Sequence, residues 1–153
     1  MITENAVYSD EVTIEAPVEL VWDILLDFAH YGEWNTFCPS AKVDSLELGS
    51  AVDMMVNLGG NLSRQVEYLC RVEPQVCVAW GMENKPEDPV HAVRSQHLQR
   101  LDKNRCTYLS VDEFAGPQMA AMLEKFANFV EEGFNRCAYD LKAHAEKCFK
   151  ASA

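Results

Sequence analysis

Two neighbouring segments that favour β-strands, residues 91–101 and 105–115, carry side chains that could do acid–base chemistry. Arg94, His97 and Tyr108 are the candidate catalytic residues among them. An imidazole takes up or releases a proton near neutral pH, and the other two side chains could hydrogen-bond to a carbonyl oxygen. Alternating polar residues also form the solvent face of antiparallel sheets, and the face on which His97 lies stays open.

A larger set of aromatic and methionine side chains could bind a ligand. Binding pockets are lined mostly by such side chains and hold only a few placed polar groups, and methionine adapts to ligands of varied shape. Ordinary packing of a hydrophobic core would explain the same residues equally well. The candidate ligand-binding residues are Trp34, Phe37, Trp80, His97, Phe114, Met119, Met122, Phe126 and Phe129.

Signatures of other reaction mechanisms are missing from the sequence. The chain has no G-x-S-x-G nucleophile motif, no phosphate-binding G-x-x-x-x-G-K-[ST] loop, no G-x-G-x-x-G and no H-E-x-x-H. Its six cysteines are irregularly spaced and include no C-x-x-C pair, so a structural zinc site is not expected. The sequence therefore predicts neither a metal nor a cofactor.

The composition is that of one folded domain spanning residues 1–153. The formal net charge is −11, which disfavours binding to nucleic acids or to anionic membrane surfaces. No apolar run approaches the ~20 residues of a membrane-spanning helix, so stable membrane insertion is not expected. The first residues lack the basic and apolar regions of a signal peptide, and a cytoplasmic location is the expectation.

Hydrophobic periodicity predicts the elements that would position these residues. One strand is expected at residues 8–14, followed by a helix that starts at Pro17 and a short helical turn at residues 30–34. A long amphipathic helix is expected over residues 117–148. Short β-prone runs between turn signals, without intervening helices, indicate six further strands of an antiparallel sheet. They are expected at residues 40–47, 50–57, 63–73, 75–82, 91–101 and 105–115.

A series of short pieces distributed over nearly the whole chain carries a family resemblance. The pieces are V-T-I-E-A-P-V-E-L-V-W at 12–22, D-F-A-H-Y-G-E-W-N-T-F-C-P at 27–39, L-G-S at 48–50, V-E-P at 72–74, Trp80, D-E-F-A-G at 112–116, G-F-N at 133–135 and D-L-K at 140–142. Together they resemble the START-like or Bet v 1-like (SRPBCC) superfamily, specifically its bacterial polyketide cyclase/dehydrase-type members. These motifs are specific for a fold and indicate little about chemistry.

The resemblance implies an α+β helix-grip fold with a central apolar cavity. In that fold a curved, antiparallel, seven-stranded sheet wraps around a long C-terminal helix, and the elements follow the order one strand, two helices, six strands and one helix. The implied partner is a small hydrophobic ligand, and the sequence leaves a homodimer open.

Three functions follow from this reading. The first is binding of a lipid, an isoprenoid or quinone, or an aromatic polyketide-like molecule for transport, sensing or presentation. The second is a cyclase/aromatase or dehydratase that uses acid–base residues in the cavity without metal or nucleotide. The third is a protein-interaction module with a vestigial cavity, filled by Trp80, Phe126 and Phe129. A buried polar cluster at the closed end of the cavity would favour the enzyme, because a carrier can do without one.

Overall fold

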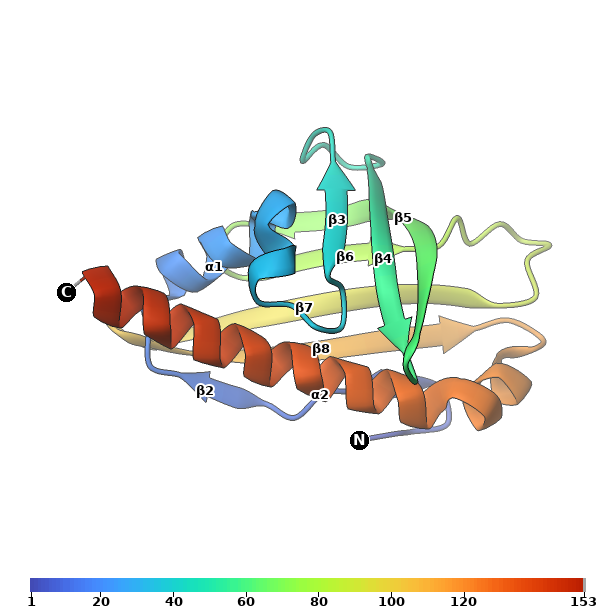
Figure 1. Cartoon of the computed structure of the whole chain (residues 1–153). Coiled ribbons are helices and arrows are strands. Elements are labelled where there is room, and N and C mark those ends of the chain that lie inside the picture. The colour runs from blue at the N-terminus through green and yellow to red at the C-terminus, as the bar shows by residue number, and fades with distance from the viewer. Residues whose placement is uncertain (153) are drawn as a thin grey trace.

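The computed structural model describes residues 1–152 and shows one antiparallel sheet with a long helix across it (Figure 1). The sheet has eight strands in the order β1-β8-β7-β6-β5-β4-β3, and β2 also pairs with β8. The strands are β1 (Ala6–Tyr8), β2 (Val12–Ile14), β3 (Ser40–Val43), β4 (Ala51–Leu58), β5 (Asn61–Glu73), β6 (Cys77–Gly81), β7 (His91–Asp102) and β8 (Arg105–Ala115). The helices are α1 (Val18–Leu26), the 3₁₀ helix η1 (Phe28–Glu33) and α2 (Met119–Ser152).

The predicted α+β helix-grip architecture is confirmed, with one correction at the N-terminal strand. The single strand expected at residues 8–14 is divided into β1 and β2, so the sheet has eight strands and not seven. Tyr8 pairs with Val111 and Val12 with Tyr108, so the first strand has one residue more than its partner between these pairs. At the break, the backbone N–H of Asp10 donates to Oδ1 of Asn135 on α2, and the backbone N–H of Ser110 on β8 donates to the side chain of Ser9.

The two short helices close one end of the sheet. Pro17 occupies the N-cap position of α1 with φ −60°, one residue before the first helical position that suits proline best. Val18, Val21, Trp22 and Leu25 form the buried side of this helix. Figure 1 shows α1 beside the C-terminal half of α2, and the loop between β6 and β7 extends at the opposite end.

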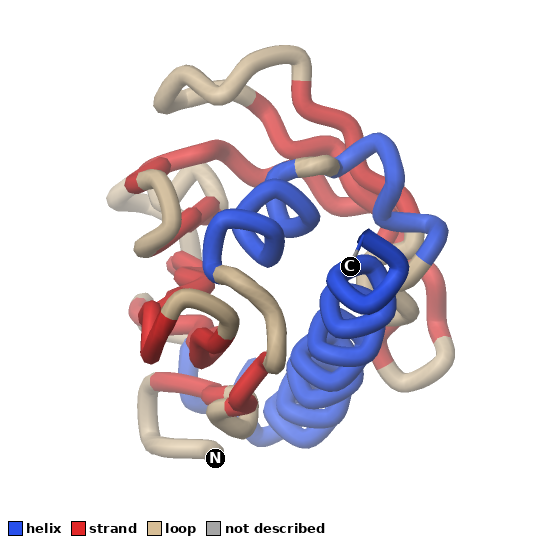
Figure 2. The backbone as a smooth tube through the Cα atoms, turned by 90° about the vertical axis from the view of Figure 1, so that its left-hand side faces the viewer, coloured by secondary structure: helices blue, strands red, loops and turns tan. Residues whose placement is uncertain are grey.

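Helix α2 has 34 residues and is about 51 Å long at 1.5 Å per residue. Figure 2 looks along this helix from its C-terminal end and shows the strands curving around it. Gly133 lies where the helix comes close to Phe37, since an added Cβ would lie 2.4 Å from that ring. A close approach therefore explains a glycine in the middle of a helix, where it otherwise costs stability.

The buried side of α2 changes along its length. Its C-terminal two thirds bury Phe134, Cys137 and Leu141 against the sheet and α1. Nearer the N-terminus, Phe126 and Phe129 are 37% and 47% exposed, although the periodicity places them in one stripe with the buried residues. No helix within residues 1–152 is long and apolar enough to cross a membrane.

Candidate ligand cavity and its polar end

A cavity of about 620 Å³ lies between the N-terminal half of α2 and the inner face of the sheet. We call it the outer chamber. Its apolar lining includes Leu58, Phe114, Met122, Phe126 and Phe129. The volume is within the range of about 300–1,000 Å³ that is typical of small-molecule sites.

A smaller space of about 60 Å³, the inner chamber, adjoins the outer chamber deeper in the fold. Phe37, Trp80, Arg94 and Phe134 contribute to its walls. The two chambers share part of their lining, so they form successive parts of one site. The shared residues are Leu58, Gln65, Glu67, Asp112 and Val130.

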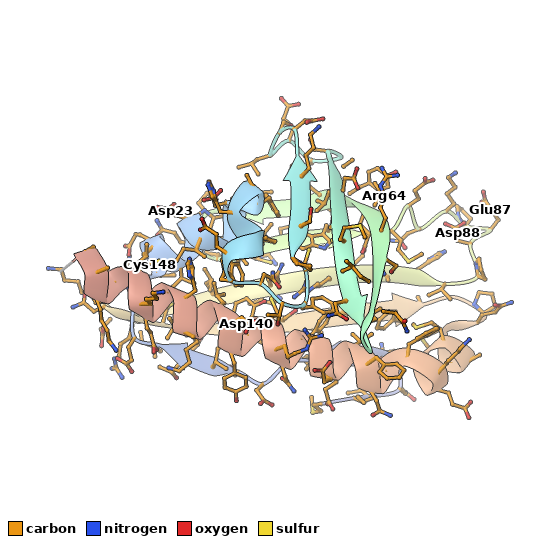
Figure 3. All side chains as sticks on the ribbon, in the orientation of Figure 1. Asp23, Arg64, Glu87, Asp88, Asp140 and Cys148 are labelled. Atoms are coloured by element: carbon orange, nitrogen blue, oxygen red, sulfur yellow. The ribbon has the colours of Figure 1, made fainter. Side chains whose placement is uncertain are left out.

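A third hollow of about 720 Å³, the side cleft, widens the opening of the outer chamber. Lys85 and Asp88 of the β6–β7 loop line it on one side, and Met82 and Met122 are common to it and to the outer chamber. Figure 3 shows Glu87 and Asp88 on this loop, at the end of the molecule away from Cys148. The site is therefore open at the end where α2 begins and closed toward Arg94.

The position of Arg94 follows from the register of the sheet. Arg94 lies opposite Asp112 on β8 and opposite Trp80 on β6. Directly paired residues of antiparallel strands point to the same face, so these three side chains form a row on the inner face. Glu67 joins this face from β5, where it pairs with the buried Val52 of β4.

The Arg94 guanidinium is held between aromatic rings. Its carbon atom Cζ lies 4.3 Å from the ring centre of Phe134, 5.3 Å from that of Phe37 and 5.8 Å from that of Trp80. Such cation–π contacts fix a charged group whose side chain is only 6% exposed. Its Nε donates to Ser110 Oγ at 2.9 Å, and Nη2 contacts Cys137 Sγ at 3.8 Å.

No carboxylate directly neutralises Arg94 in the part of the chain that the structure describes. Arg94 takes part in none of the ion pairs, all of which involve side chains nearer the surface. A guanidinium stays protonated in proteins, so this is a buried positive charge without a direct partner.

Glu67 and Asp112 are the two acids that face both chambers. Burial raises the pKa of Glu67 to about 7, and the nearby Arg94 opposes part of this rise. Burial likewise raises the pKa of Asp112 to about 8, and the negative charge of Glu67 raises it further. Asp112 Oδ1 is inaccessible and has no hydrogen-bond partner. Near neutral pH this pair of carboxyls therefore holds a proton that ordinary surface acids have lost.

A second layer of polar groups lies behind Arg94. Tyr108 donates its hydroxyl hydrogen to Gln96 Oε1 at 2.6 Å, and burial raises the pKa of that phenol well above its usual value. Gln96 is 1% exposed, and its Nε2 has no partner. These side chains support Arg94 from behind and do not line either chamber.

The structure brings most of the predicted ligand-binding residues to the cavity. Trp34 and Met119 are exceptions and lie outside both chambers. Trp34 packs between Tyr31 and His144. His97 lies on the opposite face of β7 from Arg94 and is only partly buried. The residues that line a chamber are Phe37, Trp80, Phe114, Met122, Phe126 and Phe129.

Of the three candidate catalytic residues, only Arg94 lines a chamber. Glu67 is not among the residues that the sequence singles out, whereas Asp112 belongs to the polar set of residues 105–115 but not to the three candidate catalytic residues. Alternation along β5 contains a signal for Glu67, because the residue two positions later, Leu69, is buried on the same face. Within residues 1–152 no three His, Cys, Asp or Glu side chains are grouped to hold a metal ion.

Comparison with solved structures shows the same fold over almost the whole chain. The Zhui aromatase/cyclase from Streptomyces sp. R1128 is 20% identical, with a TM-score of 0.76 and 97% of each chain covered. A protein from Nitrosomonas europaea is 18% identical, with a TM-score of 0.73 and 99% of each chain covered. A START superfamily protein from Mycobacterium smegmatis is 14% identical, with a TM-score of 0.72, and covers 94% of this chain and 99% of its own.

No curated protein sequence matches the chain. A family model described as "Polyketide cyclase / dehydrase and lipid transport" matches residues 6–146, which include every strand and most of α2. The sequence motifs, the helix-grip architecture and this match agree with one another. The chain therefore belongs to the polyketide cyclase/dehydrase and lipid transport family.

Proposed function

We propose that the protein binds an apolar, oxygen-bearing small molecule in its cavity and acts on it as a cyclase or dehydratase by acid–base chemistry. The observation that carries this proposal is the polar cluster at the closed end, where Glu67 and Asp112 line both chambers and Arg94 lines the inner one. The family contains both cyclases and lipid transport proteins by its description. A carrier does not require two carboxyl groups with raised pKa beside a buried cation.

The cluster has the groups that elimination of water from a β-hydroxy ketone requires. Arg94 donates hydrogen bonds to the carbonyl oxygen and stabilises the negative charge that develops there. One carboxylate of the Glu67–Asp112 pair removes the proton from the carbon next to the carbonyl group. The other, protonated carboxyl gives its proton to the departing hydroxyl group, so that water and a conjugated enone are formed. Aldol ring closure needs the same proton removal and the same stabilised oxygen.

A pair of acids suits both roles because its two protons leave at different pH values. The raised pKa values of about 7 and about 8 leave one carboxyl ionised and one protonated between them. The outer chamber would hold the apolar body of the substrate and exclude water from it.

The reaction can be tested with 4-hydroxy-4-phenylbutan-2-one, whose dehydration gives an enone that absorbs in the near ultraviolet. We expect the protein to accelerate this reaction with a bell-shaped pH dependence, rising through about 7 as the base ionises and falling above about 8 as the acid loses its proton. Glu67→Gln and Asp112→Asn should each lower the rate by about 10²–10⁴-fold.

Glu113→Gln is the matched control, because Glu113 is exposed, points to the other face of β8 next to Asp112, and has the smallest effect of the groups that shift the pKa of Asp112. Its rate should remain that of the wild type. A wild-type protein that binds the hydroxy ketone but leaves its rate unchanged would contradict the catalytic proposal.

Carriage of a hydrophobic ligand is the second candidate function, and the wide apolar outer chamber favours it. Native mass spectrometry of the purified protein, followed by denaturing extraction, would detect a co-purifying lipid, quinone or aromatic compound. A stoichiometric ligand together with no catalysis would establish carriage. The third function, an interaction module with a filled cavity, receives no support from the site, because Phe126 and Phe129 border an open chamber and do not fill it.

A further inference from the structure

We propose that the inner chamber is an anion site, and that the natural ligand is an apolar organic acid whose carboxylate binds Arg94 while its apolar body occupies the outer chamber. This inference rests on the proposed function only in requiring that the same cavity binds a small apolar molecule. Of the five N–H groups of Arg94, Ser110 and Cys137 occupy two and a bidentate carboxylate takes two more, so one remains to donate to the carbonyl oxygen. It adds the charge and the orientation of that molecule.

The first argument is the hydrogen-bonding capacity that Arg94 leaves unused. A guanidinium has five N–H donors, and within residues 1–152 only Ser110 and Cys137 contact them. The Cys137 thiol is a weak acceptor. Within the same range of residues Nη1 has no hydrogen-bond partner, and it remains accessible. Since Arg94 lines the inner chamber, its free edge is available to a group placed there.

The second argument is the cost of the unpaired charge. A buried cation is expensive unless an anion neutralises it. The aromatic rings of Phe37, Trp80 and Phe134 cover its faces but carry no net charge. Glu67 and Asp112 are not in direct contact with it, and burial favours their protonated forms. A carboxylate from a ligand would supply the missing negative charge and accept a bidentate pair of hydrogen bonds.

The third argument is size. A polar space of about 10–15 Å³ already holds one water molecule, so the inner chamber of about 60 Å³ has room for a carboxyl group. The apolar outer chamber is about tenfold larger, at about 620 Å³. This division between a small cationic end and a large apolar space matches a molecule with one acidic group on an apolar frame.

Ligand binding should also take up protons. The groups that interact electrostatically with Arg94 come from five parts of the fold, and they are Tyr31, Cys38, Glu67, Tyr108, Asp112 and Cys137. Burial keeps the two phenols and Cys38 protonated at neutral pH, so Glu67 and Asp112 are the acids that respond. A bound carboxylate opposes their ionisation, and binding of the acid therefore weakens as the pH rises past both of them.

The test compares 2-naphthoate with 2-naphthamide, which have almost the same shape but differ in charge. We expect the wild-type protein to bind the acid about tenfold or more tightly than the amide at pH 6 by calorimetry. At pH 9 this preference should shrink, and only the affinity for the acid should change. Arg94→Met should abolish the preference while the amide still binds. Arg64→Met should keep it, because Arg64 pairs with Asp53 at the surface of the sheet.

A second variant keeps the proposal testable if Arg94→Met does not fold. In the double variant Glu67→Gln/Asp112→Asn the closed end stays cationic, so the preference for 2-naphthoate should be as large at pH 9 as at pH 6. The inference would be overturned if the wild type bound the acid and the amide equally well. It would also be overturned if the preference for the acid survived Arg94→Met, or if the loss of preference at pH 9 persisted in the double variant. If the wild type binds both compounds equally well, the proposed function still stands, whereas if it binds neither, the proposed function is overturned as well.

Discussion

At the scale of single residues, the environment of Asp112 sets the chemistry of the site. The residue lies in the middle of β8, opposite Arg94, with Oδ1 buried and without a partner. An exposed aspartate would be ionised at neutral pH and could act only as a base. Burial and the neighbouring Glu67 raise its pKa to about 8 and make it an acid that can donate a proton. The same residue type at an exposed position, such as Asp53 in its ion pair with Arg64, has a lowered pKa.

The raised pKa of Asp112 predicts a loss of stability with rising pH. The folded protein keeps a proton on this carboxyl up to about pH 8, whereas an unfolded aspartate loses it near pH 4. The free energy of unfolding therefore falls as the pH rises between these values. In urea unfolding at pH 5 and pH 8.5, the wild type should lose at least about 1 kcal/mol more than Asp112→Asn. Equal losses in both proteins, or a larger loss in the variant, would contradict the raised pKa.

At the scale of elements, helix α2 has two parts with different roles. From Phe134 onward the helix packs into the core. The ring of Phe134 meets that of Phe37 edge-on, with the ring centroids 5.5 Å apart. Before Val130, the side chains of Met122, Phe126 and Phe129 border the cavity, where they are partly exposed. The β4–β5 hairpin contributes to this border, because Gly59, at φ +59°, lies against the ring of Phe129. One amphipathic helix thus serves as core at one end and as binding surface at the other.

The two parts of α2 predict opposite outcomes for the same substitution. Phe126→Ala should weaken binding of 2-naphthamide and cost about 1 kcal/mol or less in the free energy of unfolding, since the ring is already 37% exposed. Phe134→Ala, on the same helix, should cost about 3–5 kcal/mol because its ring is buried. Urea unfolding and calorimetry on both variants make the comparison. Wild-type affinity in a folded Phe126→Ala variant would remove that residue from the site.

At the scale of the whole molecule, the cavity opens at one end of the fold and α1 covers the other. The β6–β7 loop and the start of α2 lie at the open end (Figure 1), and residues of both line the side cleft. Polar contacts hold the closed part together, as when Asp140 accepts hydrogen bonds from the backbone and side chain of Thr36. Motion that admits a ligand is therefore expected at the open end.

Hydrogen–deuterium exchange can locate the bound ligand on this scale. We expect 2-naphthoate to slow amide exchange in residues 82–90 and 119–130, because these segments border the outer chamber and the side cleft. Residues 138–152 pack against α1 and the sheet and should exchange as in the free protein. Protection confined to residues 138–152 would place the ligand outside the proposed cavity.

Much of this fold could be predicted from the sequence, because local patterns are enough to identify its elements. Alternation marked the sheet, and the 3.6-residue period marked α2 to within a few residues of its observed bounds. The division of the first strand between Tyr8 and Val12 could not be predicted. At the break Asp10 bonds to Asn135, which lies 125 residues away in the chain, and no local pattern encodes such a contact.

The sequence alone determined the residue types available to the site, with apolar rings for a ligand and Arg94 among the polar candidates. Only the tertiary structure decided which of them meet. Strand register placed Asp112 beside Arg94 and turned His97 away, and the curvature of the sheet brought Glu67 on β5 to the same chamber. The raised pKa values of both acids depend on burial among residues from distant strands, a property of packing that no local pattern encodes.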